Sequence, residues 1–244
     1  MTKLTIIIPF KGSIKDLDVF LNNHHSIIES KSISSIFVVC KDDEGQVAKE
    51  YLYLHKIKVI MQTRKGIYNA FNDRVTQVDE GYVLFCGVDD TILISCHEIS
   101  LDNQSSDMIF IPYKKHGKII LPKFASDKMQ AQGFMESKLG MPHSHQGIVY
   151  SAKYLKNHLF SDDYEIAGDY NHLIHAMYQD SCTMSFAEKF KILIDVGGEG
   201  VSTRLRRLNR SETWRSYRLK FGIRKLFSAV IRKRLNILLE KSAP

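Results

Sequence analysis

The sequence has 244 residues, of which 44% are hydrophobic and 25% are charged. This composition is typical of a globular protein with one large core, and it excludes a disordered chain. No run of 18 or more apolar residues occurs, so we expect neither a membrane-spanning helix nor a secretory leader, and we predict a cytoplasmic protein.

The net charge of +7 is concentrated at one end of the chain. Residues 203–244 contain 13 Lys and Arg against two Glu, a net charge of +11. The remaining residues carry 21 basic and 25 acidic side chains, a net charge of −4. We therefore divide the chain into a domain at 1–203 and a basic extension at 204–244.

Apolar runs of four to eight residues alternate with segments of helical periodicity in the first part of the chain. This alternation predicts a doubly wound α/β fold, in which ligands bind beyond the carboxyl ends of parallel strands. The predicted strands are residues 4–9, 36–40, 58–62 and 82–86, and the predicted helices are residues 15–29, 45–54 and 66–78.

The pattern changes after Thr91. The segment "MIFIPYKKHGKIILP" predicts an antiparallel hairpin added to the sheet, with its turn at Lys-His-Gly. Further on we expect a short strand followed by a helix from Ser151, a helix that opens near Gly168, and a strand at 191–196 that runs into "GGEG". The four cysteines form no CxxC pair, which favours buried free thiols over zinc or redox sites.

Two adjacent carboxylates, Asp89 and Asp90, follow the predicted strand at 82–86. One interpretation is a solvated loop in which Asp90 caps a helix. The other is a site for Mg²⁺ or Mn²⁺, since hard oxygen ligands bind these ions together with a substrate diphosphate. Neither GxxxxGK[ST] nor GxGxxG occurs in the sequence, so such a diphosphate would be bound without either loop.

Several segments, in order, resemble the family 2 glycosyltransferases with a GT-A fold, in particular bacterial members of the colanic-acid type that build surface polysaccharides. The resemblance extends from about Thr2 to Thr203. Its segments are "TIIIPFKGS", "QTRKGIYNAFND", "GYVLFCGVDD", "MPHSHQGIVYSAKYL", "IAGDYNHLI" and "DVGGEGVST".

The resemblance implies an inverting transferase that uses a nucleotide-diphosphate-sugar donor and a saccharide or lipid-linked saccharide acceptor. Asp90 would ligate Mn²⁺ or Mg²⁺, and Asp89 would contact the metal or the donor ribose. Asp169 matches the family's catalytic base, with Glu165 as the substitute candidate. From the sequence alone, a helix cap is the preferred interpretation of Asp169, and the resemblance is what favours the base.

The resemblance and the charge pattern also suggest substrate contacts. His145 and Gln146 are assigned to the acceptor pocket, although the pair His143 and His145, expected on a strand, could instead be structural. The remaining histidine pair, His24 and His25, is expected on a helix surface, and Tyr68 and Phe71 are expected in the core. The expected donor contacts are Pro9, Lys11, Asp42, Asp43, Lys65, Gly66, Asn69 and Asp89.

The sequence departs from the family pattern at three positions. Cys40 stands where an aspartate commonly reads the nucleobase, and Asp42 or Asp43 would have to replace it. Asn69 replaces a frequent Asp, and Gly87 replaces the leading acid of the longer metal motif. These differences weaken the case for a uridine nucleotide as the donor and leave thymidine and guanosine nucleotides open.

The basic extension combines Arg and Lys with apolar residues at spacings of three and four, which predicts an amphipathic helix or a pair of helices with a break at Gly222. Such a segment could bind an anionic membrane surface at the inner face of the plasma membrane, or its apolar stripe could pack on the domain. No specific nucleic-acid module is present.

Two other functions remain open at this point. A sugar nucleotidyltransferase shares the alternation of strands and helices, but it normally carries a Gly-rich, Arg-containing loop after its first strand, and "PFKGSIKD" lacks one. The altered segment "VVCKDDEG" would also suit an inactive protein of the same fold that serves as a membrane-docking scaffold.

Overall fold

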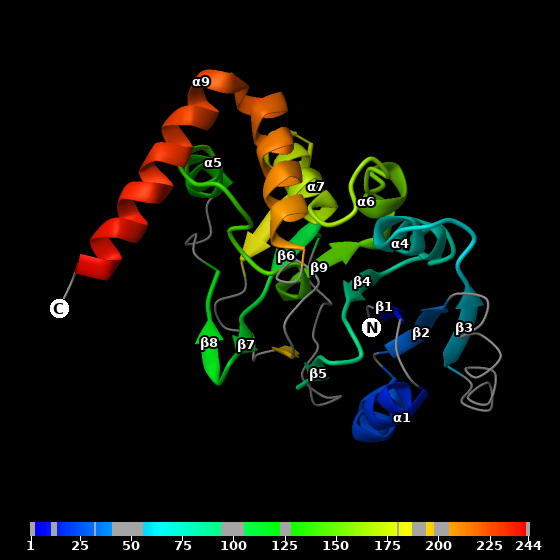
Figure 1. Ribbon diagram of the computed structural model, residues 1–244. Helices are drawn as coiled ribbons and strands as arrows, with labels where there is room; N and C mark the ends of the chain where they lie inside the picture. Colours follow the sequence, from blue (N-terminus) through cyan, green and yellow to red (C-terminus); the bar gives the residue numbers. More distant parts are fainter. Residues whose placement is uncertain are drawn as a thin grey trace.

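The computed structural model describes residues 3–10, 14–31, 33–40, 56–93, 105–122, 128–179, 181–186, 194–197 and 205–242. Its centre is a seven-stranded sheet with the strand order β10-β6-β9-β4-β1-β2-β3 (Figure 1). The strands are β1 (Leu4–Pro9), β2 (Ile33–Cys40), β3 (Ile57–Met61), β4 (Tyr82–Phe85), β6 (Met108–Phe110), β9 (Ile148–Ser151) and β10 (Met184–Phe186).

One half of this sheet is parallel and the other half is mixed. β1 pairs in parallel with β2 and β4, and β2 pairs in parallel with β3, as the strand-helix alternation predicts. β9 runs antiparallel to both β4 and β6. The carboxyl ends of β1, β2, β3 and β4 therefore lie at one edge of the sheet.

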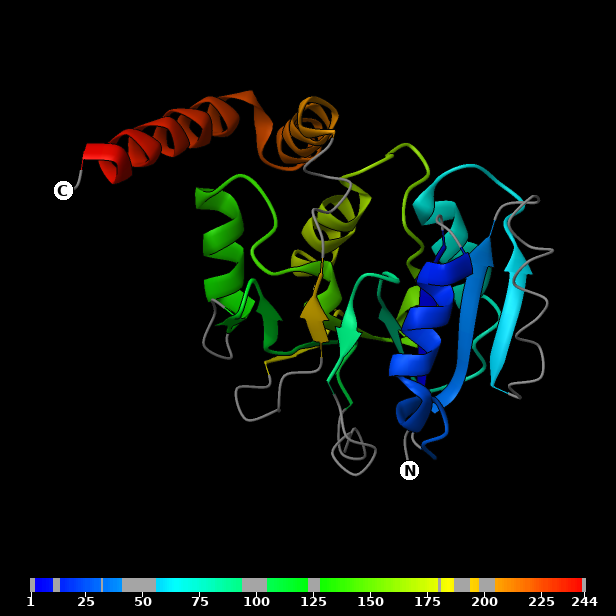
Figure 2. The ribbon, with the colours of Figure 1, turned by 60° about the horizontal axis from the view of Figure 1, so that its bottom comes forward.

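Helices cover both faces of the sheet. Alternate residues of β1 divide between two cores, since Ile6 and Ile8 belong to one and Ile7 to the other. The first core includes the apolar face of α1 (Ile14–Asn23), which lies across the sheet in Figure 2. The second includes residues of α4 (Ile67–Val75), α6 (Ala152–Asn157) and α7 (Gly168–Met177).

A second sheet has the strand order β5-β11-β7-β8. Its strands are β5 (Thr91–Ile92), β11 (Ile194–Val196), β7 (Tyr113–Lys115) and β8 (Lys118–Ile120). The predicted hairpin is therefore partly wrong. β7 and β8 do form an antiparallel pair around a left-handed turn at His116 and Gly117, but the preceding apolar run forms β6 in the main sheet.

Several predicted elements differ in their ends. The expected helix at 15–29 is interrupted at His24, after which α2 (His25–Ile28) continues. The expectation that His24 lies on the surface is wrong: it is buried, its Nδ1 donates to Phe20 O at 2.6 Å, and its Nε2 accepts from Ile92 N at 2.9 Å. His25 is exposed as expected. The expected helix at 45–54 lies outside the described residues.

Other expectations are confirmed. The helix predicted from Ser151 is α6, and the Ser151 hydroxyl accepts a hydrogen bond from Tyr154 N. Cys40, Cys86 and Cys182 are buried free thiols, whereas Cys96 lies outside the described residues. Sequence analysis did not identify α5 (Lys128–Ser137), β5 or β10.

The basic extension forms α9 (Arg206–Ser242). Gly222 has a non-helical backbone (φ 81°, ψ 166°), so the segment is two helices joined at a kink, as the sequence predicts. The part before the kink lies along α7, and the chain passes α5 on its way to the C-terminus (Figure 1). Among the described residues, we find no helix with the length and apolarity needed to cross a membrane.

Candidate active site

The acidic doublet directly follows β4, at the carboxyl edge of the parallel strands. Asp90 is buried, with 3% of its surface exposed. Its Oδ2 accepts a hydrogen bond from Gly87 N at 2.6 Å, and its Oδ1 accepts one from Gly197 N at 3.0 Å. Burial raises the pKa of Asp90 to about 6, and the neighbouring charge of Asp89 acts in the same direction. Asp90 thus joins the β4 turn to the end of β11.

Asp89 differs from its neighbour because it is exposed. The chain after β11 passes so close to it that a Cβ added to Gly197 would lie 1.7 Å from Asp89 O. Only glycine fits at position 197, so β11 and the doublet form one unit. Each oxygen of Asp90 already accepts one hydrogen bond from a backbone amide, whereas the carboxylate of Asp89 is exposed and open to a ligand. That Asp90 ligates a metal stays a prediction.

A metal site at the doublet fits the chemistry of Asp89, because an exposed carboxylate is a hard oxygen donor of the kind that Mg²⁺ and Mn²⁺ prefer. Within the described ranges, no group of three or more His, Cys, Asp or Glu side chains could hold a metal ion alone. A cation bound here would accordingly need further oxygen ligands from a substrate, as is usual for Mg²⁺ with diphosphates.

Asp169 lies in the first turn of α7 and is half-buried. Its Oδ1 accepts a hydrogen bond from Tyr170 N at 2.8 Å and lies 3.2 Å from the hydroxyl of Tyr68, which also donates to Ile166 O at 2.6 Å. Burial raises the pKa of Asp169 to about 6. A carboxyl with this pKa is a proton acceptor near neutral pH.

Gly168 sets the distance between α7 and α4. A Cβ at this position would lie 2.6 to 2.8 Å from three atoms of the Tyr68 ring. The helix can approach Tyr68 only because residue 168 has no side chain. Tyr68 is in the core as expected, but its hydroxyl reaches the candidate base. This function could not be recognised from the sequence, because the two residues are 101 positions apart.

The N-terminus of α4 supplies polar groups at the same edge. Gly66 precedes the helix with a φ of 103°, which favours glycine, and its carbonyl accepts a hydrogen bond from Gln62 Nε2 at 2.7 Å. Lys65 is exposed, and its carbonyl accepts from Asn69 Nδ2 at 2.7 Å. Asn69 Oδ1 is buried and has no hydrogen-bond partner in the described part of the chain, so it is available to a ligand hydroxyl.

His145 and Gln146 belong to a short 3₁₀ helix, η2 (His145–Gly147), rather than to the expected strand. The imidazole of His145 packs against the rings of both Phe71 and Phe85, with centroid distances of 5.5 and 5.0 Å. Burial lowers the pKa of His145 to about 3. This packing favours a structural role for His145, and the predicted acceptor contact then rests on Gln146, which is half-buried.

The structure describes some of the remaining predicted residues and not others. His143 is buried, with Nε2 2.7 Å from Ile111 O, and does not share a strand face with His145. Pro9 ends β1 at the carboxyl edge. Lys11, Asp42 and Asp43 lie outside the described residues. Glu165, the substitute base, is exposed and precedes α7.

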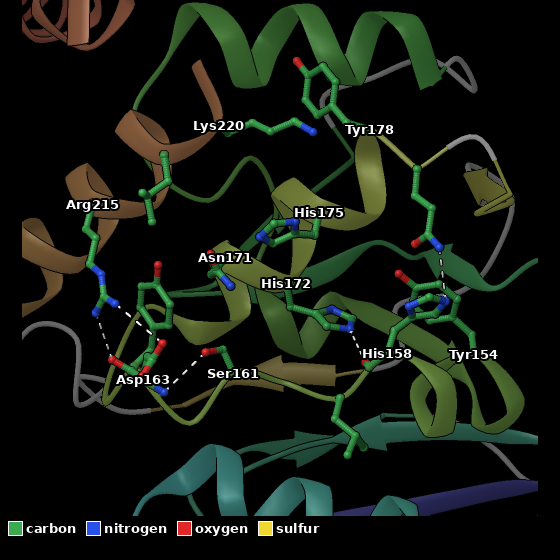
Figure 3. A pocket seen from close by; sticks show the side chains of 14 residues that line it. Tyr154, His158, Ser161, Asp163, Asn171, His172, His175, Tyr178, Arg215 and Lys220 are labelled. Carbon is green, nitrogen blue, oxygen red and sulfur yellow. Dashed lines mark hydrogen bonds and ion pairs between the residues drawn. The ribbon is translucent and has the colours of Figure 1, made fainter. Parts of the chain in front are cut away.

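A separate pocket of about 630 Å³ lies between α6, α7 and α9 (Figure 3). His158, Tyr178 and Lys220 are among its lining residues, and none of the predicted site residues lines it. Neither the doublet nor Asp169 lines this pocket, although α7 contributes residues to it.

Comparison with known proteins identifies the fold. No family model matches the sequence, and no curated protein matches it. Staphylococcus aureus TarS 1–349 in complex with UDP-GlcNAc has a similar structure, with a TM-score of 0.64 and 18% identity over 89% of this chain and 65% of that chain. Another structure of TarS 1–349 gives a TM-score of 0.62, with the same identity and coverage.

A mannosyltransferase, PcManGT from Pyrobaculum calidifontis, in complex with GDP-Man and Mn²⁺, gives a TM-score of 0.59 with 12% identity, over 90% of this chain and 64% of that chain. The chain thus spans slightly less than two thirds of the length of each of these structures. At these identities the similarity shows the fold, and it confirms the predicted GT-A architecture of a central sheet flanked by helices.

Proposed function

We propose that this protein is a metal-dependent, inverting glycosyltransferase of the family 2 type. It would transfer a sugar from a nucleotide-diphosphate-sugar to a hydroxyl group of a saccharide or lipid-linked saccharide in bacterial surface polysaccharide or lipopolysaccharide synthesis. The observation that carries the proposal is the arrangement at the carboxyl edge of the sheet. There an open carboxylate, Asp89, follows β4, and a carboxyl with a raised pKa, Asp169, begins α7 beside α4.

The donor side of the site would be built on β4 and α4. Asp89 would hold Mn²⁺ or Mg²⁺, and Asp90 would fix the turn through its bonds to Gly87 N and Gly197 N. Bound there, the cation would neutralise the charge that develops on the leaving diphosphate. Lys65 and the helix N-terminus at Gly66 favour phosphate, and the free Oδ1 of Asn69 suits a hydroxyl of the donor.

Asp169 would act as the general base. It would accept the proton of the acceptor hydroxyl as that oxygen forms a bond to the anomeric carbon and the bond from this carbon to the diphosphate oxygen breaks. Direct displacement of this kind inverts the anomeric centre. With a pKa of about 6, Asp169 is deprotonated at neutral pH and still basic enough to accept the proton.

We also propose that the protein is cytoplasmic and binds the inner face of the plasma membrane through α9. After the kink, exposed apolar residues recur every four positions and lie between cations such as Arg224, Arg232 and Arg234. The opposite side of the helix is buried at Leu226 and Ala229. An exposed apolar stripe with cationic flanks suits an anionic bilayer surface. The stripe consists of Ile223, Phe227, Ile231 and Leu235.

Calorimetry tests the donor proposal. We expect a nucleoside diphosphate from the uridine, thymidine or guanosine series to bind in the presence of Mn²⁺ and to bind at least roughly tenfold more weakly when the metal is chelated. An inactive scaffold would show no metal-dependent binding. A nucleotidyltransferase would form a nucleotide-sugar from a sugar phosphate and a nucleoside triphosphate, and either result would contradict the proposal.

Sedimentation with vesicles tests the membrane proposal. We expect binding to vesicles that contain phosphatidylglycerol, and loss of binding in the double variant Phe227→Ser, Ile231→Ser. Ile119→Ser is the matched control, because Ile119 is an equally exposed apolar residue on β8. Unchanged binding of the double variant would show that the stripe is not the membrane contact.

A further inference from the structure

A buried carboxylate of α9 contacts the segment that leads into α7. Glu212 has 7% of its surface exposed. Its Oε1 accepts a hydrogen bond from Glu165 N at 2.9 Å. Its Oε2 accepts from Ile166 N at 2.9 Å and from Ala167 N at 2.8 Å. One side chain therefore satisfies three consecutive backbone amides about 46 positions earlier in the chain.

These amides would otherwise lack acceptors. Residues 165–167 lie outside helices and strands, and a buried N–H without a partner is costly. Ala167 is the N-cap residue of α7 and has no side-chain oxygen to bond the first amides of the helix. Of the amides at the start of α7, the Glu212 carboxylate bonds that of the N-cap residue, Ala167, and it places a negative charge near the N-terminus of the helix.

Arg215 strengthens the same contact one helical turn later. Its guanidinium donates to Asp163 O at 3.4 Å and forms an ion pair with the Asp163 carboxylate at 3.6 Å (Figure 3). The guanidinium also lies over the Tyr164 ring, 5.1 Å from its centroid. Residues 163–167 are therefore held by α9 at two adjacent points.

The segment bound by Glu212 leads directly to Asp169. The N–H of Ile166 donates a hydrogen bond to Glu212. The carbonyl of Ile166 accepts a hydrogen bond from the hydroxyl of Tyr68. The same hydroxyl lies 3.2 Å from Asp169 Oδ1. A displacement of residues 165–167 would thus move both the start of α7 and the position of the Tyr68 hydroxyl.

We propose that Glu212 is a positioning residue that holds Asp169 in its reactive place, and that the basic extension is in this way part of the active site. The proposal rests on the proposed function, in which Asp169 is the base. It assigns the first part of α9, before the kink at Gly222, a role separate from membrane binding.

The charge of Glu212 gives this role a measurable signature. Burial is the main cause of the raised pKa of Asp169. Hydrogen bonds from Tyr170 N and from the hydroxyl of Tyr68 of α4 lower this pKa, and the negative charge of Glu212 of α9 raises it. Tyr150 of β9 is also coupled to Asp169 but is neutral near pH 7, because burial raises the pKa of its hydroxyl well above the usual value. Removing the charge of Glu212 should therefore lower the pKa of Asp169.

Glu212→Gln tests the proposal, with Glu136→Gln as the matched control. Glu136 of α5 also bonds α9, through Lys225 at 2.9 Å, but does not contact residues 163–167. In Glu212→Gln we expect kcat to fall roughly 10- to 100-fold with the donor KM unchanged, because the base is misplaced. The acid limb of the kcat profile should move to lower pH. In Glu136→Gln we expect kcat and the pH of the acid limb to equal those of the wild-type protein.

Glu212→Asp separates the effect of side-chain length from the effect of charge. It also replaces Glu212→Gln in this test if that variant does not fold. It keeps the charge but is one methylene shorter, so we expect a similar loss of kcat with a smaller movement of the limb. Wild-type kcat in Glu212→Asp, or equal losses in Glu212→Gln and Glu136→Gln, would overturn the proposal.

Carboxyl NMR gives a result that does not depend on transfer. We expect Asp169 to titrate at lower pH in Glu212→Gln than in the wild-type protein, and at the wild-type value in Glu136→Gln. An unchanged titration in Glu212→Gln would overturn the proposal that Glu212 acts on Asp169. Absence of transfer in the wild-type protein, together with the expected titration shift, would instead overturn only the proposed function.

Discussion

The two sides of the candidate site are held together differently. The donor side, on β4 and α4, combines nearby contacts, such as the bond from Gly87 N to Asp90 and the bond from Asn69 to Lys65 O, with one distant contact, the bond from Gly197 N to Asp90. The base side depends on contacts between distant segments. Asp169 lies next to Tyr68, and the chain before it is bonded to Glu212.

This difference suggests which part of the site would bind the donor and which part would act in the reaction. The turn after β4 is fixed by its own backbone and by one contact with the end of β11, so the metal and donor groups depend on few other parts of the chain. A base placed by three separate elements can be misplaced by a change in any of them. We therefore expect substitutions on the base side to change kcat, and substitutions at the doublet to change donor binding.

The largest expected effect is that of Asp169→Asn. Removing a general base costs about 10²- to 10⁴-fold in rate, so we expect transfer to fall by this factor while metal-dependent nucleotide binding is retained. Steady-state kinetics and calorimetry on the same preparation check the two parts. Full activity would show that another group, such as Glu165, is the base.

The second effect separates the two residues of the doublet. In Asp89→Asn we expect Mn²⁺-dependent nucleotide binding to weaken at least roughly tenfold, with an unchanged melting temperature, because Asp89 is exposed. In Asp90→Ala two backbone amides lose their acceptor, at about 1–3 kcal/mol each. The melting temperature should then fall by about 2–4 °C for each kcal/mol. The reverse pattern would make Asp90 the ligand.

A smaller effect is expected for Tyr68→Phe. Loss of one hydrogen bond of about 1 kcal/mol should reduce kcat about fivefold. Because the bond from Tyr68 lowers the pKa of Asp169, its removal should raise that pKa and move the acid limb of the kcat profile to higher pH. This direction is opposite to that of Glu212→Gln. A limb that does not move would show that Tyr68 only packs against Gly168.

A further effect concerns stability and not transfer. The folded protein holds the pKa of Asp169 at about 6, above the value of 3.8 expected when it is unfolded. The free energy of unfolding therefore falls as pH rises from about 4 to 6, because Asp169 loses its proton at a higher pH in the folded state than in the unfolded state. Asp169→Asn should accordingly raise the melting temperature at pH 7.5, by about 2–4 °C for each kcal/mol gained, and should have no effect below pH 4. Calorimetric scans at both pH values check this.

The sequence predicts the donor side better than the base side. The run of apolar residues at 4–9 and the glycine at 66 identify β1 and the start of α4, because these signals are local. Asp169 was identified through a resemblance. Tyr68 and Glu212 were not identified, because their roles depend on contacts with residues 166 to 169 that arise only after folding. The sequence predicts a strand at His145 because HxH fits strand alternation, but His145 begins a 3₁₀ helix and its imidazole packs against the rings of Phe71 and Phe85.

The most direct test of the central claim is a crystal grown with a nucleoside diphosphate and Mn²⁺, measured for anomalous scattering from manganese. We expect the manganese peak beside the Asp89 carboxylate, with diphosphate oxygens among its other ligands. A doublet without manganese, and a nucleotide bound elsewhere or not at all, would contradict the account.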